Sequence, residues 1–127
     1  MALLLDTHAL IWFITDDANL PGKVRRSISD MNNRCFVSIV SLWEIAVKKS
    51  LGKLQLDMTI GQLSKVIARS GIGILQISPA HISWLSTLEF HHRDPFDRLI
   101  ISQAIVEGHK IVSKDAHFPK YTPEVMW

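Results

Sequence analysis

The chain has 127 residues, a formal net charge of +2, a hydrophobic content of 47% and a charged content of 20%. This composition excludes a disordered chain, and the length predicts one globular domain over residues 1–127 whose core needs no covalent support. Because the net charge is close to zero, the choice of partner depends on local groups of charge.

The sequence carries one cysteine and no segment typical of a membrane anchor or a secretion signal. Cys35 alone cannot form an internal disulfide, which fits a reducing compartment, and its apolar surroundings predict a buried side chain. No apolar run approaches the roughly 18 residues of a membrane span. The apolar start of the chain lacks a basic segment and is interrupted by Asp6 and His8. We expect a cytoplasmic protein without membrane contact.

Short apolar runs alternate along the chain with longer periodic segments. The runs predict strands at residues 2–5, 35–38, 72–77 and 110–113, with a weaker signal at 124–127. Apolar spacing, proline and glycine predict helices over 7–15, 20–31, 39–51 and 59–70, one from Pro79, and one from Asp94-Pro95 to Glu107. This order predicts the α/β class, as a three-layer α/β/α sandwich around a short parallel sheet. We expect the tryptophans in the core: Trp12, Trp43, Trp84 and Trp127.

Four acidic residues lie where a predicted strand leads into a helix, or just inside that helix: Asp6, Glu44, Asp97 and Asp115. In a parallel sheet those points converge on one edge, where ligands bind. Two like charges about 4 Å apart repel by about 4 kcal/mol near a protein surface, so gathered carboxylates need compensation. A divalent cation is the simplest compensation, and Mg²⁺ or Mn²⁺ held by oxygen ligands suits hydrolysis of a phosphodiester.

Each acid also has a structural explanation, which stays open at this point. Asp6 matches a helix N-cap, and Asp115 matches a turn residue. Asp94-Pro95-Phe96-Asp97 is typical of a helix start, with the cap at Asp94 and an acid at the third helical position. Ser41 and Glu44 match a capping box. Lys48, four residues after Glu44, is a candidate ion-pair partner for that carboxylate.

Other chemistries lack their patterns. No Ser–His or Cys–His arrangement predicts covalent catalysis, no His-Glu-x-x-His predicts zinc, and no glycine-rich phosphate loop is present. A phosphatase of the haloacid dehalogenase type needs a second aspartate two residues after the first, where this chain has His8. A receiver domain needs an aspartate after the third strand, where Ser78 and Pro79 stand.

Four motifs together resemble a known family. They are Leu-Leu-Leu-Asp-Thr-His from Leu3, Ser-x-x-Ser-x-x-Glu from Ser38, His-Arg-Asp-Pro-Phe-Asp-Arg from His92, and Ser-Lys-Asp-Ala-His-Phe from Ser113. In order and spacing the chain resembles a PIN domain over essentially its whole length. Within that family it is most similar to the VapC-type toxins of bacterial toxin–antitoxin pairs.

The resemblance implies an endoribonuclease that depends on Mg²⁺ or Mn²⁺. It assigns Asp6, Glu44, Asp97 and Asp115 as the catalytic and metal-binding acids, with Asp97 rather than Asp94 as the third. Secondary site candidates are Thr7, Ser41, Asp94 and Ser113; a threonine often occupies the position of Ser113. The resemblance also implies a homodimer inhibited by a cognate antitoxin. A non-catalytic PIN-like module that only binds proteins remains the alternative, as does an acidic-pocket phosphatase.

Basic residues that lie close to the acids in sequence are candidates for contact with RNA phosphates: Lys48, Lys49, Arg93 and Arg98. The other explanation for them is a solvated helix surface. The sequence leaves open the RNA target, the identity of the antitoxin and whether one metal ion or two are bound.

Overall fold

The strands and helices of the computed structural model, which describes residues 1–127, alternate along the chain as the sequence predicts. The strands are β1 (Ala2–Leu5), β2 (Arg34–Ser38), β3 (Gly73–Leu75), β4 (Lys110–Val112) and β5 (Val125–Met126). The helices are α1 (Thr7–Ile14), α2 (Gly22–Ser29), α3 (Ile39–Ser50), α4 (Ile60–Arg69), α5 (Pro79–Thr87) and α6 (Pro95–Glu107). A 3₁₀ turn, η1, covers Phe118–Lys120.

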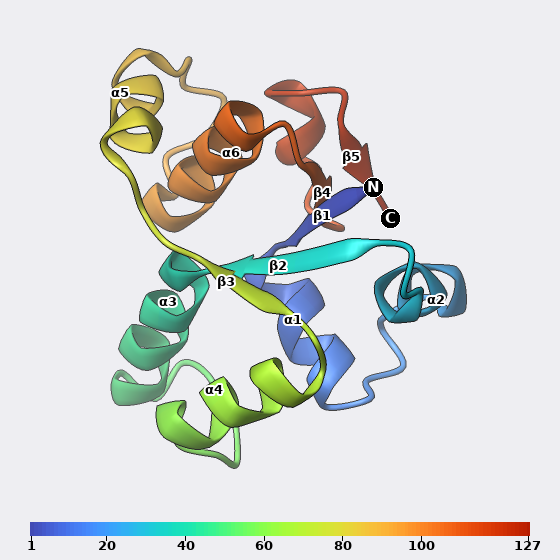
Figure 1. The fold of residues 1–127 in the computed structure, drawn as a ribbon. Coiled ribbons are helices and arrows are strands. Elements are labelled where there is room, and N and C mark those ends of the chain that lie inside the picture. Colours follow the sequence, from blue (N-terminus) through green and yellow to red (C-terminus); the bar gives the residue numbers. More distant parts are fainter.

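The strands form one sheet in the order β3-β2-β1-β4-β5, and every neighbouring pair is parallel. Helices cover both of its faces, with α1 to α4 on one side and α5 and α6 on the other (Figure 1). The α/β class and the three-layer α/β/α sandwich are therefore confirmed. None of the helices is long and apolar enough to cross a membrane.

Alternation along β1 divides the core into two parts. Leu3 and Leu5 are fully buried among the helices on the α1 side, whereas Leu4 is fully buried against α6. A strand buried on both faces reads as a continuous apolar run, which is why residues 2–5 carry no polar side chain.

The chain reverses its direction of travel across the sheet at β1. From β1 it proceeds to β2 and β3 on one side, and it later returns to β4 and β5 on the other. At such a switch point the connections leave the sheet in opposite directions and open a crevice at the carboxyl ends of the strands. The residue after β1 meets the last residue of β4 there, since the Asp6 amide donates a hydrogen bond of 3.0 Å to the Val112 carbonyl.

Several predicted boundaries need correction. The third strand covers three residues rather than 72–77, and α2 ends at Ser29 rather than Met31. At the start of β3, a Cβ on Gly73 would lie 2.9 Å from the Phe36 ring, so glycine permits the close approach of β3 to β2.

Two tryptophans do not lie in the core. Trp12 and Trp127 pack against the core on the α1 side, but Trp43 is 56% exposed and Trp84 is 46% exposed. The prediction was wrong for these two because each lies on an outer helix surface. Trp43 instead makes an edge-to-face contact with Phe96, at 4.8 Å between ring centroids.

Candidate active site

Asp6 joins β1 to α1 and is almost fully buried. Its Oδ1 accepts a hydrogen bond of 2.8 Å from the Ala9 amide, which makes it the N-cap of α1 as predicted. Its Oδ2 accepts a hydrogen bond of 2.5 Å from the Ser113 hydroxyl. Capping does not remove the carboxylate from the crevice, because an N-cap lies at the end of the helix that faces the carboxyl edge of the sheet.

Glu44 projects from α3 toward α1 and is only 3% exposed. The Thr7 hydroxyl donates a hydrogen bond of 2.6 Å to its Oε1, and the Lys48 ammonium forms an ion pair with its Oε2. The Thr7 and Ser41 hydroxyls lie 2.9 Å apart in the same buried network. These partners compensate a carboxylate that would otherwise carry a large desolvation penalty.

The capping box predicted for Ser41 and Glu44 does not form. Helix α3 begins at Ile39, and its N-cap is Ser38, whose hydroxyl accepts a hydrogen bond of 3.0 Å from the Val40 amide. Glu44 therefore lies more than one turn inside the helix, too far along it to reach the orphan amides of the first turn. Its role is decided by tertiary contacts rather than by the end of the helix.

The two acids at the start of α6 have separate positions. Asp94 is the N-cap, and its Oδ1 accepts a hydrogen bond of 2.9 Å from the Asp97 amide, as predicted for that residue. The Asp97 side chain is 19% exposed, and its Oδ2 lies 3.2 Å from Nε2 of His92. Its Oδ1 accepts no hydrogen bond from the protein.

Asp115 follows β4 after a short irregular segment. Its amide donates a hydrogen bond of 3.0 Å to the Ser113 hydroxyl, and its Oδ1 accepts one of 2.8 Å from the His117 amide. This is the turn arrangement predicted for an aspartate at this position. The Ser113 hydroxyl thus contacts both Asp6 and the backbone of Asp115, which fixes the residues after β1 relative to those after β4.

The four carboxylates act on one another electrostatically. Burial, together with the charges of Asp115 and Glu44, raises the pKa of Asp6 to about 6, against the hydrogen bonds that Asp6 accepts from Ser113 and Ala9. Burial likewise raises the pKa of Asp97 to about 6, with contributions from Asp94, Glu44 and Asp115. Asp6 and Asp97 therefore respond to the same two neighbouring carboxylates, although they come from opposite layers of the sandwich.

The donor set fits a hard divalent cation, although it is not a closed cage. No three His, Cys, Asp or Glu side chains are arranged to hold one ion by themselves. Mg²⁺ does not need such a cage, because it keeps several waters and takes one or two carboxylates. Asp6 and Asp97, whose charged forms are disfavoured by burial and by neighbouring acids, are the carboxylates that a cation would stabilise most.

Two of the basic candidates form hydrogen bonds within the protein, and RNA contact by them stays a prediction that these bonds oppose. Arg98 is 4% exposed, and its guanidinium donates hydrogen bonds to the carbonyls of Glu89 and Leu88. The Lys49 ammonium donates to the carbonyls of Leu56 and Met58, which follow α3. Both side chains hold loops in place.

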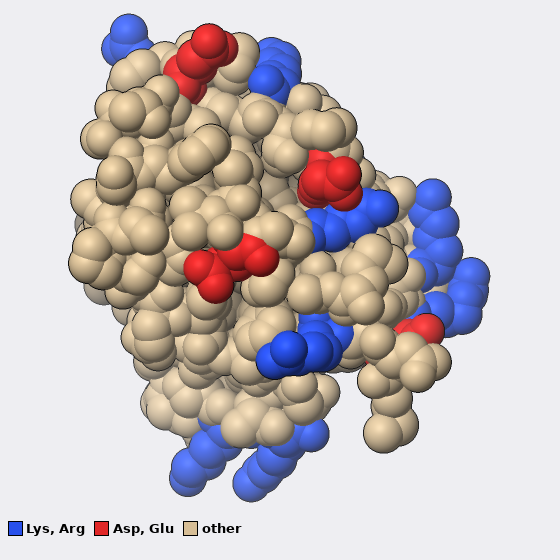
Figure 2. All heavy atoms as spheres, turned by 45° about the horizontal axis from the view of Figure 1, so that its top comes forward, with Lys and Arg blue, Asp and Glu red and all other residues tan.

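Lys48 and Arg93 remain candidates. Lys48 forms an ion pair with Glu44: burial lowers the pKa of Lys48, but the hydrogen bond to Glu44 and the charges of Glu44, Asp94 and Asp97 outweigh this and raise it. Arg93 is exposed. Lys and Arg form separate groups on the face shown in Figure 2, with neutral surface between them, so no continuous basic patch marks a path for RNA on this face.

Sequence reasoning missed the support of Asp97. Nδ1 of His92 lies 2.8 Å from the Tyr121 hydroxyl, to which the Arg98 guanidinium donates a hydrogen bond of 3.2 Å. The His92 ring also stacks on that of His117, at 4.6 Å and 14°. The motif beginning at His92 was part of the resemblance, but Tyr121 lies 29 residues away, and no local pattern links the two.

The sequence matches the family model of the PIN domain over residues 3–122, and the chain therefore belongs to the PIN domain family. Members of this family are generally nucleases that use divalent metal ions. A comparison with curated protein sequences gives no match.

Solved structures share the fold across the whole chain. VapBC2 from Rickettsia felis, bound to a DNA fragment from its promoter, is 18% identical with a TM-score of 0.71, covering 100% of this chain and 98% of that chain. VapBC-1 from nontypeable Haemophilus influenzae is 17% identical with a TM-score of 0.67, covering 100% and 96%. A toxin–antitoxin complex from Klebsiella pneumoniae is 16% identical with a TM-score of 0.61, covering 98% and 96%.

Proposed function

We propose that this PIN domain is a metal-dependent endoribonuclease and the toxin of a toxin–antitoxin pair. The observation that carries the proposal is the electrostatic state of Asp6 and Asp97. Both are buried acids with the pKa raised to about 6, and both are raised by the same neighbours, Glu44 and Asp115. Groups perturbed in this way by burial and like charge cluster at functional sites. In the proposal, the site that they define in this PIN domain is the nuclease centre.

In this proposal Asp6, Glu44, Asp97 and Asp115 hold Mg²⁺ or Mn²⁺, directly or through water. When bound there, such an ion would supply Lewis acidity toward the scissile phosphate and would lower the pKa of a bound water. The polar side chains around the acids orient them: Ser113 fixes Asp6, Thr7 and Lys48 fix Glu44, and His92 contacts Asp97. Asp94 contributes as the cap that starts α6, and Ser41 as a member of the Thr7 network.

The partners in the proposal are an RNA substrate, a second copy of the chain and a cognate antitoxin in the cytoplasm. Its support is the likeness in fold to proteins solved as toxin–antitoxin complexes. An inhibitor of such a site needs to neutralise the crevice acids, so a basic segment is the expected chemistry of the antitoxin contact.

A cleavage assay tests the proposal. Purified protein should cut single-stranded RNA in Mg²⁺ or Mn²⁺ and lose that activity in EDTA. Asp6→Asn keeps the shape and the N-cap but removes one charge, so it should cost orders of magnitude in rate while the protein stays folded. Undiminished cleavage in EDTA would refute the metal mechanism. A folded protein that neither cuts RNA nor binds Mn²⁺ would instead be a PIN-like interaction module.

A further inference from the structure

A pocket opens beside the acids on the side of α1 and β4. It has a volume of about 200 Å³ and is lined by Asp6, His8, Trp12, Lys114 and Asp115. Two of these are the acids that follow β1 and β4. The other three have no part in holding the carboxylates, and they belong to chemical types that recognise something other than a metal ion.

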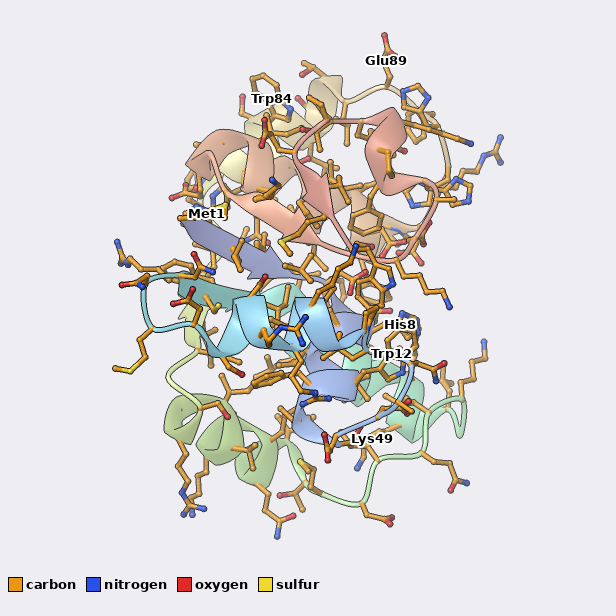
Figure 3. The ribbon with its side chains drawn as sticks, turned by 90° about the vertical axis from the view of Figure 1, so that its right-hand side faces the viewer. Met1, His8, Trp12, Lys49, Trp84 and Glu89 are labelled. Carbon is orange, nitrogen blue, oxygen red and sulfur yellow. The ribbon has the colours of Figure 1, made fainter.

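The aromatic wall of the pocket comes from α1. His8 and Trp12 are four residues apart on this helix and therefore share one face, with ring centroids 5.5 Å apart and a tilt of 46°. Figure 3 shows the two side chains lying together and projecting from the same side of the molecule. The centroid of the Trp127 ring lies 5.8 Å from that of the Trp12 ring, so Trp127 packs beside Trp12 and supports the position of its side chain.

The charge in the pocket is unexpected for a site that serves only a cation. Lys114 lies between Ser113, the first residue after β4, and Asp115, which begins the acidic turn. Its ammonium is 5.9 Å from the centroid of the Trp12 ring, close enough for a cation–π interaction. A lysine at this position opposes a further metal ion and favours an anionic group next to the rings.

The aromatic rings suit the base of a nucleotide, and the ammonium group beside the carboxylates suits its phosphate. We propose that this pocket is a nucleotide subsite: the His8 and Trp12 rings receive an unpaired base, and Lys114 contacts a phosphate next to the scissile one. The inference rests on the proposed nuclease function and deepens it by naming the residues that contact a base and a phosphate of the substrate. Bases stack on aromatic side chains only when they are free of their own stack, so RNA loops and single strands can enter the subsite and duplex cannot.

The test uses RNA binding in the Asp97→Asn background, in which the RNA stays intact. The probe is a short fluorescein-labelled single-stranded RNA of mixed sequence, with Mg²⁺ present, followed by fluorescence anisotropy. His8→Ala should weaken binding roughly tenfold, the loss expected for one base–aromatic stack, and His8→Phe should restore it because a ring remains. Lys114→Gln should weaken binding and flatten the salt dependence by about one unit.

Trp84 provides the matched control, since it is a half-exposed tryptophan that lies well away from His8 and Trp12, near the top of Figure 3. Trp84→Ala should bind RNA like the parent protein. In the active background, His8→Ala should raise KM by a similar factor and change kcat little. If His8→Ala and Lys114→Gln bind like the parent, or if His8→Phe is as weak as His8→Ala, the subsite does not exist, although RNA cleavage by the wild type still stands. If the wild type neither binds nor cuts RNA, the proposed function fails with it.

Discussion

Ser113 and Asp6 are 107 residues apart in sequence, yet the Ser113 hydroxyl donates a hydrogen bond of 2.5 Å to the Asp6 carboxylate. The same hydroxyl accepts a hydrogen bond from the Asp115 amide. One side chain therefore connects the acids that follow β1 and β4, the two strands at the switch point of the sheet. This bond opposes the effect of burial on Asp6, whose pKa is nevertheless raised to about 6.

The raised pKa of Asp6 predicts how stability depends on pH in EDTA. In the folded protein the Asp6 carboxyl keeps its proton up to about pH 6, whereas the ordinary pKa of an aspartate is 3.8. Between these two values the native state therefore binds more protons than the unfolded state. Stability from this group therefore falls as pH rises through that window. The asparagine in Asp6→Asn cannot titrate. The unfolding free energy of this variant should therefore exceed that of the wild type by an amount that grows from pH 4 to about pH 6.5 and reaches on the order of 2 kcal/mol. Thermal melts that run parallel for both proteins across this range would contradict the assignment.

The two acids at the start of α6, Asp94 and Asp97, should have different functions. Asp94→Ser preserves an N-cap, so it should keep most of the stability and the cleavage activity, whereas Asp94→Ala should cost about 1 kcal/mol. Asp97→Asn should abolish cleavage with little loss of melting temperature. Thermal melts and one RNA cleavage assay on each variant suffice. An inactive Asp94→Ser together with an active Asp97→Asn would show that the third acid is Asp94.

Lys48 should matter for stability because Glu44 is buried. Lys48→Met leaves the Glu44 carboxylate without its cation, which should cost on the order of 2 kcal/mol of unfolding free energy. Adding Glu44→Gln removes the uncompensated charge and should recover much of the loss. Lys53→Met is the control, because Lys53 is exposed and pairs with no acid. Denaturant unfolding of the four proteins measures the effect; equal losses in the single and double variants would show that the pair is not coupled.

Tyr121 should influence the metal site although it contacts none of the four acids. Tyr121→Phe removes the hydroxyl that fixes His92 and accepts from Arg98, so we expect roughly tenfold weaker Mn²⁺ binding, as for other groups that orient a metal ligand. The effect should vanish in the Asp97→Asn background if it acts through that carboxylate. Calorimetric titration with Mn²⁺ measures the effect of Tyr121→Phe on Mn²⁺ affinity in both backgrounds. If Tyr121→Phe still weakens Mn²⁺ binding roughly tenfold in the Asp97→Asn background, Tyr121 does not act through Asp97.

The parts of the fold with local signals could be predicted from the sequence. Helix α6 is the clearest case: Asp94 caps it, Pro95 begins it, and Gly108 ends it at a φ of +69° that suits glycine. The placement of Asp6 and Asp115 after buried strands could be predicted equally well, because a parallel sheet brings such residues to one edge.

The rest depended on contacts between distant segments. Ser41 and Glu44 matched a capping box, but β2 ends at Ser38 and this residue is the N-cap of the helix. Arg98 looked like an RNA contact because it follows Asp97, but the loop before α6 folds over it, and its guanidinium lies 3.8 Å from the centroid of the Phe90 ring. Such a burial has no signature in sequence spacing.

The central claim is that the acids from the two layers form one divalent-ion site, and calorimetric titration with Mn²⁺ tests it most directly. Wild-type protein should bind Mn²⁺, and Asp6→Asn and Asp97→Asn, which change opposite sides of the sheet, should each weaken that binding at least tenfold while both proteins remain folded. Absence of Mn²⁺ binding by the folded wild type, or wild-type affinity in either variant, would contradict a shared site.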